Sequence, residues 1–369
     1  MVKIMRREKL VQFMDEQGVD AVAVNAGPSL TYLTGLHFHL MERPVVIVFS
    51  KGVAPTIILP ELERAKLDLL DYDVRCFTYG EDPDSWKQLF ADALVDLDLD
   101  RKKIAVEPRQ LRVLEYELLK SAISGAEFVD GSAIIAALRA VKGADEIAAM
   151  QKAVRVAEEA LEATLPLIRV GVDEKEIAAE LFLQLMRHGS ETSLPFSPIV
   201  AAGPNGANPH STPSARKLRS GDLLIIDWGA RCNGYASDLT RTFGIGELGD
   251  TEKTIHNLVR LANRAGRLAG GVGVACEQVD RATRSVIENG GYGQYFTHRT
   301  GHGIGLECHE DPYIRDGNSQ ALDVGMTYTV EPGIYLPGQN GARIEDDVVI
   351  TEQGPESLST MTRELRYLE

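Results

Sequence analysis

Cysteine is scarce and scattered in this chain of 369 residues. The four cysteines form no Cys-x-x-Cys pair; they are Cys76, Cys232, Cys276 and Cys308. Such spacing argues against a thiolate-rich zinc or iron–sulfur site and favours free thiols over disulfides. Free thiols are typical of the cytosol, so we expect a cytoplasmic protein.

Positive charge and long apolar runs are also lacking. The chain has 39 lysines and arginines against 54 aspartates and glutamates, a formal net charge of −15. Nucleic acids and anionic membranes bind clustered Lys and Arg, so neither is an expected partner. No apolar run approaches the roughly 20 residues that span a bilayer. Residues 1–9 lack the apolar core of a signal peptide, which again favours the cytoplasm.

The length of the chain exceeds what one hydrophobic core usually sustains, so we expect two domains. Over the first 130 residues, short β-branched runs alternate with amphipathic stretches, which predicts an α/β domain. Its expected strands are residues 20–25, 44–49, 56–59, 74–78 and 103–106. Its expected helices are residues 8–17, 61–70, 84–96 and 113–122. It carries no glycine-rich nucleotide loop, so we predict no chemistry for this domain alone.

The pattern changes near residue 135, where we place the domain boundary. The expected helices beyond it are residues 145–168, 173–188, 251–269 and 276–289. Asp173 and Glu176 form a capping box at the start of the second of these helices. A helix pair followed by strands occurs twice in this order, which predicts an α+β domain made of two similar halves.

Two aspartates frame a predicted hairpin. The pair Asn233-Gly234 favours a two-residue turn because both residues tolerate positive φ. Counting outward from the turn, Gly229 faces Asp238, and Asp227 lies on the same sheet face, diagonal to Asp238. An apolar run leads into Asp227, where an unpaired buried carboxylate would be costly. We therefore expect both carboxylates to converge on metal ions, with Gly229 leaving room for them.

Further candidate ligands follow in the last seventy residues. The segment Thr-Gly-His-Gly-Ile-Gly-Leu-Glu-Cys-His-Glu carries His302 and His309, and its glycines allow a close backbone approach. Glu331 and Glu345 flank a glycine-rich loop and can return to one another across a second strand pair. On composition alone, the two aspartates after Glu345 compete with it. One imidazole with four carboxylates suits Mn, Co, Zn or Fe(II). The residues thus indicate a two-metal site of Asp227, Asp238, His302, Glu331 and either Glu345 or one of the two aspartates after it.

The order of these motifs resembles the pita-bread metallopeptidases. This family comprises methionine aminopeptidase, prolidase and aminopeptidase P, with creatinase as a metal-free relative. The motifs are Asp-Trp-Gly, a second aspartate, Gly-His-Gly-Ile-Gly, Glu-Pro-Gly-Ile-Tyr and Arg-Ile-Glu-Asp, in that order. The resemblance covers the chain from about residue 140 onward. It implies a catalytic domain of two halves related by a pseudo-two-fold axis, with the metals between them.

The resemblance also implies a role for each ligand. Asp227 would bind one ion through both oxygens, while Asp238 and Glu345 would bridge the pair. His302 and Glu331 would bind the other ion. Two ions about 3.5–4 Å apart would share a bridging water and activate it as hydroxide. Glu331 would also serve as general acid/base. By the same transfer, the two aspartates after Glu345 are left solvated or outside the ligand shell.

Other residues match positions that contact substrate in the family. His210, His298 and His309 would donate hydrogen bonds to the substrate carbonyl, the tetrahedral intermediate and the leaving group. Of these, we expect His210 and His309 to be catalytic and His298 to bind substrate. Arg343 would orient the carboxylates or meet a substrate carboxylate, and Tyr335 would line the same pocket.

The expected substrate is a short peptide with proline after the first residue. Prolidase and aminopeptidase P carry an additional α/β domain and cleave before proline, where the bond is a tertiary amide without an N–H. The compact length favours an Xaa-Pro dipeptidase similar to prokaryotic ones, with Arg315 a second candidate for the substrate carboxylate. Aminopeptidase P, which accepts longer peptides, is the alternative.

Two other classes of the same fold are less favoured. Creatinase-like C–N hydrolases lack the complete ligand set, and non-catalytic binding proteins typically lose ligands, whereas all five ligands are present here. The expected cofactors are two divalent ions, Mn or Co before Zn or Fe(II). The resemblance also suggests a homodimer, in which residues 36–40 would reach the active site of the partner.

Overall fold

The computed structural model describes residues 2–369, and it divides into two compact units after Arg139. The division falls at the end of helix α5 (Ser132–Ala140), and the predicted boundary near residue 135 lies within that helix. Among the described residues, no helix is long and apolar enough to cross a membrane.

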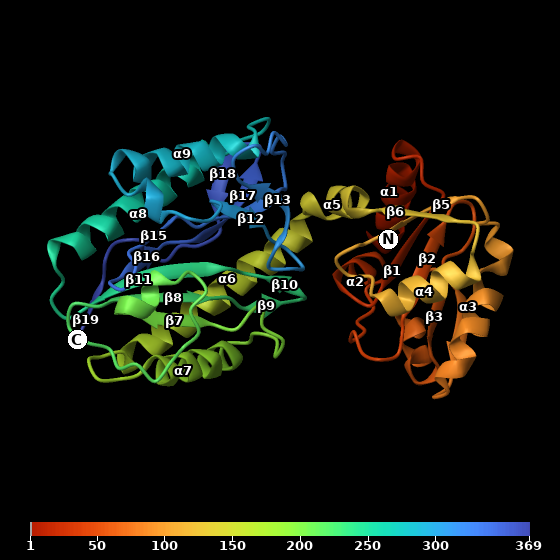
Figure 1. Cartoon of the computed structure of the whole chain (residues 1–369), viewed down its shortest axis with the longest axis horizontal. Helices are drawn as coiled ribbons and strands as arrows, with labels where there is room; N and C mark the ends of the chain where they lie inside the picture. Colours follow the sequence, from red (N-terminus) through yellow and green to blue (C-terminus); the bar gives the residue numbers. More distant parts are fainter. Residues whose placement is uncertain (1) are drawn as a thin grey trace. The chain divides into compact units, whose positions relative to one another are not determined.

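A six-stranded sheet forms the centre of the first unit, with the strand order β4-β3-β2-β1-β5-β6 (Figure 1). Strand β1 pairs antiparallel with β2 and parallel with β5, so the sheet is mixed. The strands are β1 (Ala21–Asn25), β2 (Val46–Ser50), β3 (Thr56–Pro60), β4 (Arg75–Tyr79), β5 (Lys103–Val106) and β6 (Glu127–Asp130). The central strands are almost wholly buried, as their continuous β-branched runs require.

The helices of this unit differ in places from the prediction. They are α1 (Val2–Glu16), α2 (Pro28–Thr34), α3 (Trp86–Leu94), α4 (Val113–Ala122) and α5, with 3-10 turns η1 (Glu61–Leu69), η2 (Pro83–Ser85) and η3 (Val95–Leu97). The helix expected at residues 61–70 is wrong in type, because residues 61–69 form the 3-10 helix η1, which buries none of its residues. Helix α2 was not predicted, although Pro28 at its start and Gly35 at its end are typical boundary residues.

The second unit contains two helix pairs, each followed by strands. The helices are α6 (Ala144–Thr164), α7 (Glu174–Arg187), α8 (Asp250–Ala269) and α9 (Cys276–Asn289), with 3-10 turns η4 (Leu165–Leu167), η5 (Gly203–Ala207) and η6 (Gly293–Tyr295). The predicted capping box is confirmed, since the Asp173 carboxylate accepts from the Glu176 backbone N–H and the Glu176 carboxylate accepts from that of Asp173.

The strands of the second unit form two larger sheets with the orders β19-β11-β8-β7 and β13-β12-β14-β17-β18, and two short pairs, β9–β10 and β15–β16. In the first sheet and its adjoining pair, the strands are β7 (Ile199–Ala202), β8 (Leu223–Trp228), β9 (Arg231–Cys232), β10 (Tyr235–Ala236), β11 (Leu239–Ile245) and β19 (Tyr367–Leu368). The others are β12 (Gly301–Gly303), β13 (Glu310–Ile314), β14 (Thr327–Val330), β15 (Gly333–Tyr335), β16 (Gly341–Arg343), β17 (Asp346–Thr351) and β18 (Gly354–Ser357).

The strands lie between the two helix pairs, with α7 on one side and α8 and α9 on the other (Figure 1). Helices α6 and α7 share a hydrophobic cluster with β7, β8 and β11. Helix α9 shares another with β13, β14 and β17. The two halves join where the Glu345 N–H donates to the Thr240 carbonyl at 3.0 Å. This junction brings the carboxylates of both halves into one place.

Candidate metal centre

The hairpin that carries Asp227 and Asp238 has the predicted register. Asn233 and Gly234 both have positive φ, and pairing outward from the turn sets Asp227 opposite Thr240. Asp227 and Asp238 therefore face the same side of the sheet, as expected. The expectation that Gly229 leaves room for the ions is wrong, because a Cβ at this position would lie 2.0 Å from the Ser237 carbonyl oxygen. The glycine permits close backbone approach rather than leaving room for ions.

Glu331 and Glu345 lie opposite one another in the second half. Strand β15 pairs with β16 and β14 pairs with β17 in one continuous register, with Gly333 opposite Arg343 and Val330 opposite Asp346. Glu331 falls between these two pairs, directly across from Glu345. The predicted return across the glycine-rich loop is therefore observed.

Donor atoms of the five predicted ligands come together in overlapping groups. Within each group, every ligand atom lies within 4.8 Å of the others. The groups are Asp227 with Asp238 and Glu345, His302 with Glu331 and Glu345, and Asp238 with His302 and His309. His302 Nε2 lies 3.3 Å from Glu331 Oε1, while its Nδ1 lies 3.1 Å from the Gly303 carbonyl oxygen. That second contact leaves Nε2 to face the carboxylates.

Burial makes this cluster of charges costly without cations. It raises the pKa of Asp227, Asp238 and Glu345, and their mutual repulsion raises those of Asp238 and Glu345 further. Burial also raises the pKa of Glu331 to about 7 and lowers that of His302. Asp227 Oδ1 is buried and has no hydrogen-bond partner within residues 2–369. An unpaired buried carboxylate oxygen beside further oxygen donors and one imidazole fits divalent ions.

A hydrogen-bonded chain leads away from Asp227. Arg343 Nη2 donates to Asp227 Oδ2 at 2.7 Å, and Arg343 Nη1 donates to Tyr335 Oη at 2.9 Å. Tyr335 Oη lies 2.9 Å from His298 Nε2. Burial raises the pKa of Tyr335 to about 12 and lowers that of His298 to about 4. Of the two roles expected for Arg343, this geometry favours orienting a carboxylate over meeting a substrate carboxylate.

His210 and His309 are the exposed histidines of the site. The ring centroids of His309 and His302 lie 4.0 Å apart. Partial burial lowers the pKa of His309, and repulsion from His210 contributes to the same shift. His210 also follows Pro209, whose carbonyl accepts from Arg343 Nη1 at 3.3 Å. Both imidazoles can therefore meet a ligand that enters from solvent. Arg315, by contrast, is exposed and contacts the Asp316 carbonyl.

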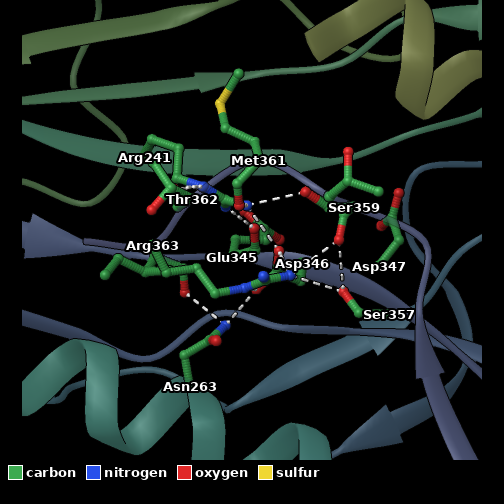
Figure 2. Close-up of polar contacts among 12 residues, drawn as sticks. Arg241, Asn263, Glu345, Asp346, Asp347, Ser357, Ser359, Met361, Thr362 and Arg363 are labelled. Atoms are coloured by element: carbon green, nitrogen blue, oxygen red, sulfur yellow. Dashed lines mark hydrogen bonds and ion pairs between the residues drawn. The ribbon is translucent and has the colours of Figure 1, made fainter. Parts of the chain in front are cut away.

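The solvated alternative for Asp346 and Asp347 is wrong, because both side chains are fully buried. Burial alone would raise the pKa of Asp346, but Arg241 and Arg363 hold it well below its usual range (Figure 2). Asp347 Oδ2 accepts from the Asp238 backbone N–H at 3.1 Å. Sequence reasoning overlooked the arginine partners of Asp346, because Arg241 stands 105 residues before it and no local pattern links Arg363 to it.

Two further contacts at the site were not predicted. Cys308 Sγ donates to Asp238 Oδ2 at 3.0 Å, so this thiol lies at the ligand cluster. Lys142 Nζ forms a buried ion pair with Glu310 Oε1 at 2.6 Å, next to His309. A lysine just after the domain boundary gives no local signal of such a partner, whereas Cys308 stands inside the histidine motif and could have been considered.

Comparison with known proteins agrees with this geometry. Residues 148–352 match the model of metallopeptidase family M24, and residues 6–141 match that of the creatinase/prolidase N-terminal domain. The chain therefore belongs to metallopeptidase family M24, and the predicted pita-bread fold with an α/β N-terminal domain is confirmed. The family and the similarity to Xaa-Pro dipeptidases together make it a metal-dependent exopeptidase, which implies divalent ions and a peptide substrate.

Relatives in this family indicate which peptidases the chain is similar to. It is 35% identical to an Xaa-Pro dipeptidase of Lactobacillus delbrueckii subsp. lactis, over 99% of each chain. A prolidase of Thermococcus sibiricus is 33% identical, with a TM-score of 0.93 over 100% of this chain and 99% of that one. An X-Pro aminopeptidase of Thermotoga maritima is 32% identical, with a TM-score of 0.85 over 98% and 99%.

Proposed function

We propose that this chain is an Xaa-Pro dipeptidase with two divalent ions in its catalytic centre. The observation that carries the proposal is the set of overlapping groups that Asp227, Asp238, His302, Glu331 and Glu345 form within 4.8 Å. The similarity to an Xaa-Pro dipeptidase over 99% of both chains supports the choice of substrate. Manganese and cobalt are the proposed ions, because oxygen donors outnumber nitrogen donors four to one in this set.

The five ligands would divide between the ions. Asp227 would hold one ion and His302 with Glu331 the other, while Asp238 and Glu345 would be available to both. When bound, two such ions activate water and polarise the scissile carbonyl. The main chain around these residues is paired in strands of both halves, so the ligands are held in place before substrate arrives.

Glu331 is the proposed general acid/base. It is the most exposed of the four carboxylate ligands, with a side chain 16% exposed against 12% for Asp227 and 7% for Asp238. A carboxylate at the edge of the cluster can take a proton from attacking water and deliver it to the proline nitrogen. That nitrogen must gain a proton to leave as an amine, as in the hydrolysis of any amide, and in an Xaa-Pro bond it carries no N–H beforehand.

His309 and His210 are proposed to contact the reacting peptide. Both face solvent beside the cluster, and each can donate a hydrogen bond to a carbonyl whose charge grows during attack. In this proposal His298 and Tyr335 support substrate binding indirectly, because the Tyr335 hydroxyl is hydrogen-bonded to both His298 and Arg343. Arg343 thus acts as a positioning residue for Asp227.

Aminopeptidase P is the second candidate, because the chain is also similar to an X-Pro aminopeptidase over nearly its whole length. Peptides of defined length separate the two activities. A dipeptidase must recognise the C-terminal carboxylate of its substrate, so capping Xaa-Pro as the amide should reduce kcat/KM by about tenfold or more. The free dipeptide should also be cleaved faster than Xaa-Pro-Yaa. Faster cleavage of the tripeptide would identify an aminopeptidase P instead.

A further inference from the structure

Asp346 is a buried anion directly beside a metal ligand. It follows Glu345 and begins β17, so the two side chains point to opposite sides of the strand. Glu345 faces Asp227 and Asp238, whereas Asp346 faces Arg241, Arg363 and helix α8 (Figure 2). The contacts that fix Asp346 therefore also fix the backbone at Glu345.

Four hydrogen bonds fill the acceptor sites of Asp346. Its Oδ1 accepts from Arg241 Nη2 and from Arg363 Nη2, each at 2.8 Å. Its Oδ2 accepts from Arg363 Nε at 2.8 Å and from Asn263 Nδ2 at 2.9 Å. Arg267 Nε lies a further 3.4 Å from Oδ2. Paired arginine forks of this kind fix direction as well as distance, so Asp346 has little freedom to shift.

The same arginines tie Glu345 to the end of the chain. Arg241 Nη1 donates to the Glu345 carbonyl at 2.7 Å, and Arg241 Nε donates to the Thr362 carbonyl at 3.0 Å. Arg363 comes from this terminal segment, where its Nη2 also donates to Ser357 Oγ at 2.9 Å (Figure 2). Glu158 of helix α6 anchors the segment from the far side by accepting from the Met361 N–H at 2.8 Å.

We propose that Asp346, Arg241 and Arg363 form a positioning unit that sets the place of Glu345 and thereby the affinity for the two ions. The proposal rests on the proposed two-metal centre, in which Glu345 contacts both ions. Glu345 is also oriented by Thr240, whose Oγ1 donates to Glu345 Oε2 at 2.7 Å. The side chain is thus fixed by Thr240 and its backbone by the positioning unit. Residues 357–363 become part of the metal site without touching an ion.

The proposal is tested by measuring how tightly a variant without the Arg363 guanidinium binds metal. Metal-free full-length Arg363→Met is titrated with Mn²⁺ by calorimetry, and its melting temperature is measured in chelator. We expect at least one dissociation constant to rise tenfold or more, the usual effect of losing an outer partner of a ligand. Excess Mn²⁺ should restore kcat for Xaa-Pro cleavage. Arg366→Met is the matched control, since Arg366 of the same segment pairs with the exposed Glu162, away from Asp346.

Unchanged dissociation constants in Arg363→Met would overturn the proposal, even with a lower melting temperature, because the cluster would then serve stability alone. If that variant does not fold, Arg363→Lys and Ser359→Ala decide the question. Each removes part of the network, since Ser359 Oγ accepts from Arg241 Nη2 at 2.9 Å. Wild-type binding in both would overturn the proposal equally. Wild-type protein that binds fewer than two ions would instead contradict the proposed function, and the inference with it.

Discussion

The ligand residues form a cluster of negative charge that the protein alone does not neutralise. Arg343 pairs with Asp227 at 2.7 Å, but Asp238, Glu331 and Glu345 remain crowded beside it. Buried charges of one sign destabilise a fold unless counter-ions enter. Ion binding should therefore stabilise the second unit as well as supply the chemistry.

Replacing His309 tests a role in the reaction apart from the ions. We expect His309→Ala to lower kcat for Xaa-Pro cleavage at least tenfold, because the lost hydrogen bond acts on the transition state. Metal content measured by mass spectrometry should stay near that of the wild type. Loss of both ions in this variant would make His309 a ligand and contradict the assignment.

Glu331 should make the metal-free protein sensitive to pH. Its folded pKa of about 7 lies above the ordinary value of 4.5, so its contribution to stability is present below 4.5 and is lost as pH rises through 7. The melting temperature of Glu331→Gln relative to wild type should therefore rise between pH 5.5 and 8, both measured in chelator. Removing Glu331 also lessens the raised pKa of Asp238 and Glu345, to which its charge contributes, and this acts in the same direction. A constant difference across this range would contradict the buried, proton-binding state of Glu331.

At the scale of secondary-structure elements, the two hairpin-like strand pairs determine the site. Each brings two carboxylates together through its register, and the Thr240–Glu345 bridge joins the pairs. A shift of one residue in either register would turn its ligands to the other face of the sheet. Gly229, opposite Asp238, protects the first of these registers because its backbone lies close to that of Ser237.

Gly229→Ala tests this dependence on register. A Cβ there would lie 2.0 Å from the Ser237 carbonyl oxygen, so the strand carrying Asp238 must move. We expect a loss of about 1–3 kcal/mol in the free energy of unfolding and much weaker Mn²⁺ binding. Gly80→Ala, where the added carbon meets nothing within 4 Å, is the control. Equal melting temperatures for the two variants would show that the strands adjust freely.

The sequence was most informative where local rules decide the structure. The Asn233-Gly234 turn and the capping box at Asp173 each specify one geometry, so the hairpin register and the start of α7 were predictable. Whether residues 61–69 form an α-helix or a 3-10 helix depended on their burial, which no local pattern reveals. The partners of Asp346 lay beyond prediction for a similar reason, because Arg241 stands 105 residues before it.

At the scale of the whole molecule, assembly is the open prediction. Within the first unit, His37, His39 and Leu40 are exposed in the loop that follows α2, while Leu36 is buried. An exposed apolar and histidine-bearing segment is suited to contact with a second copy of the chain. We expect a homodimer by sedimentation at assay concentration. A monomer with full activity would exclude a role for residues 36–40 in a partner's site.

The proposed catalysis depends on two ions held by one set of side chains. Anomalous diffraction from a crystal grown with excess Mn²⁺ tests this most directly. It should show two peaks, each bound by members of the set Asp227, Asp238, His302, Glu331 and Glu345, at a separation of about 3.5–4 Å. Ordered side chains at these positions with no anomalous peak between them would contradict the account.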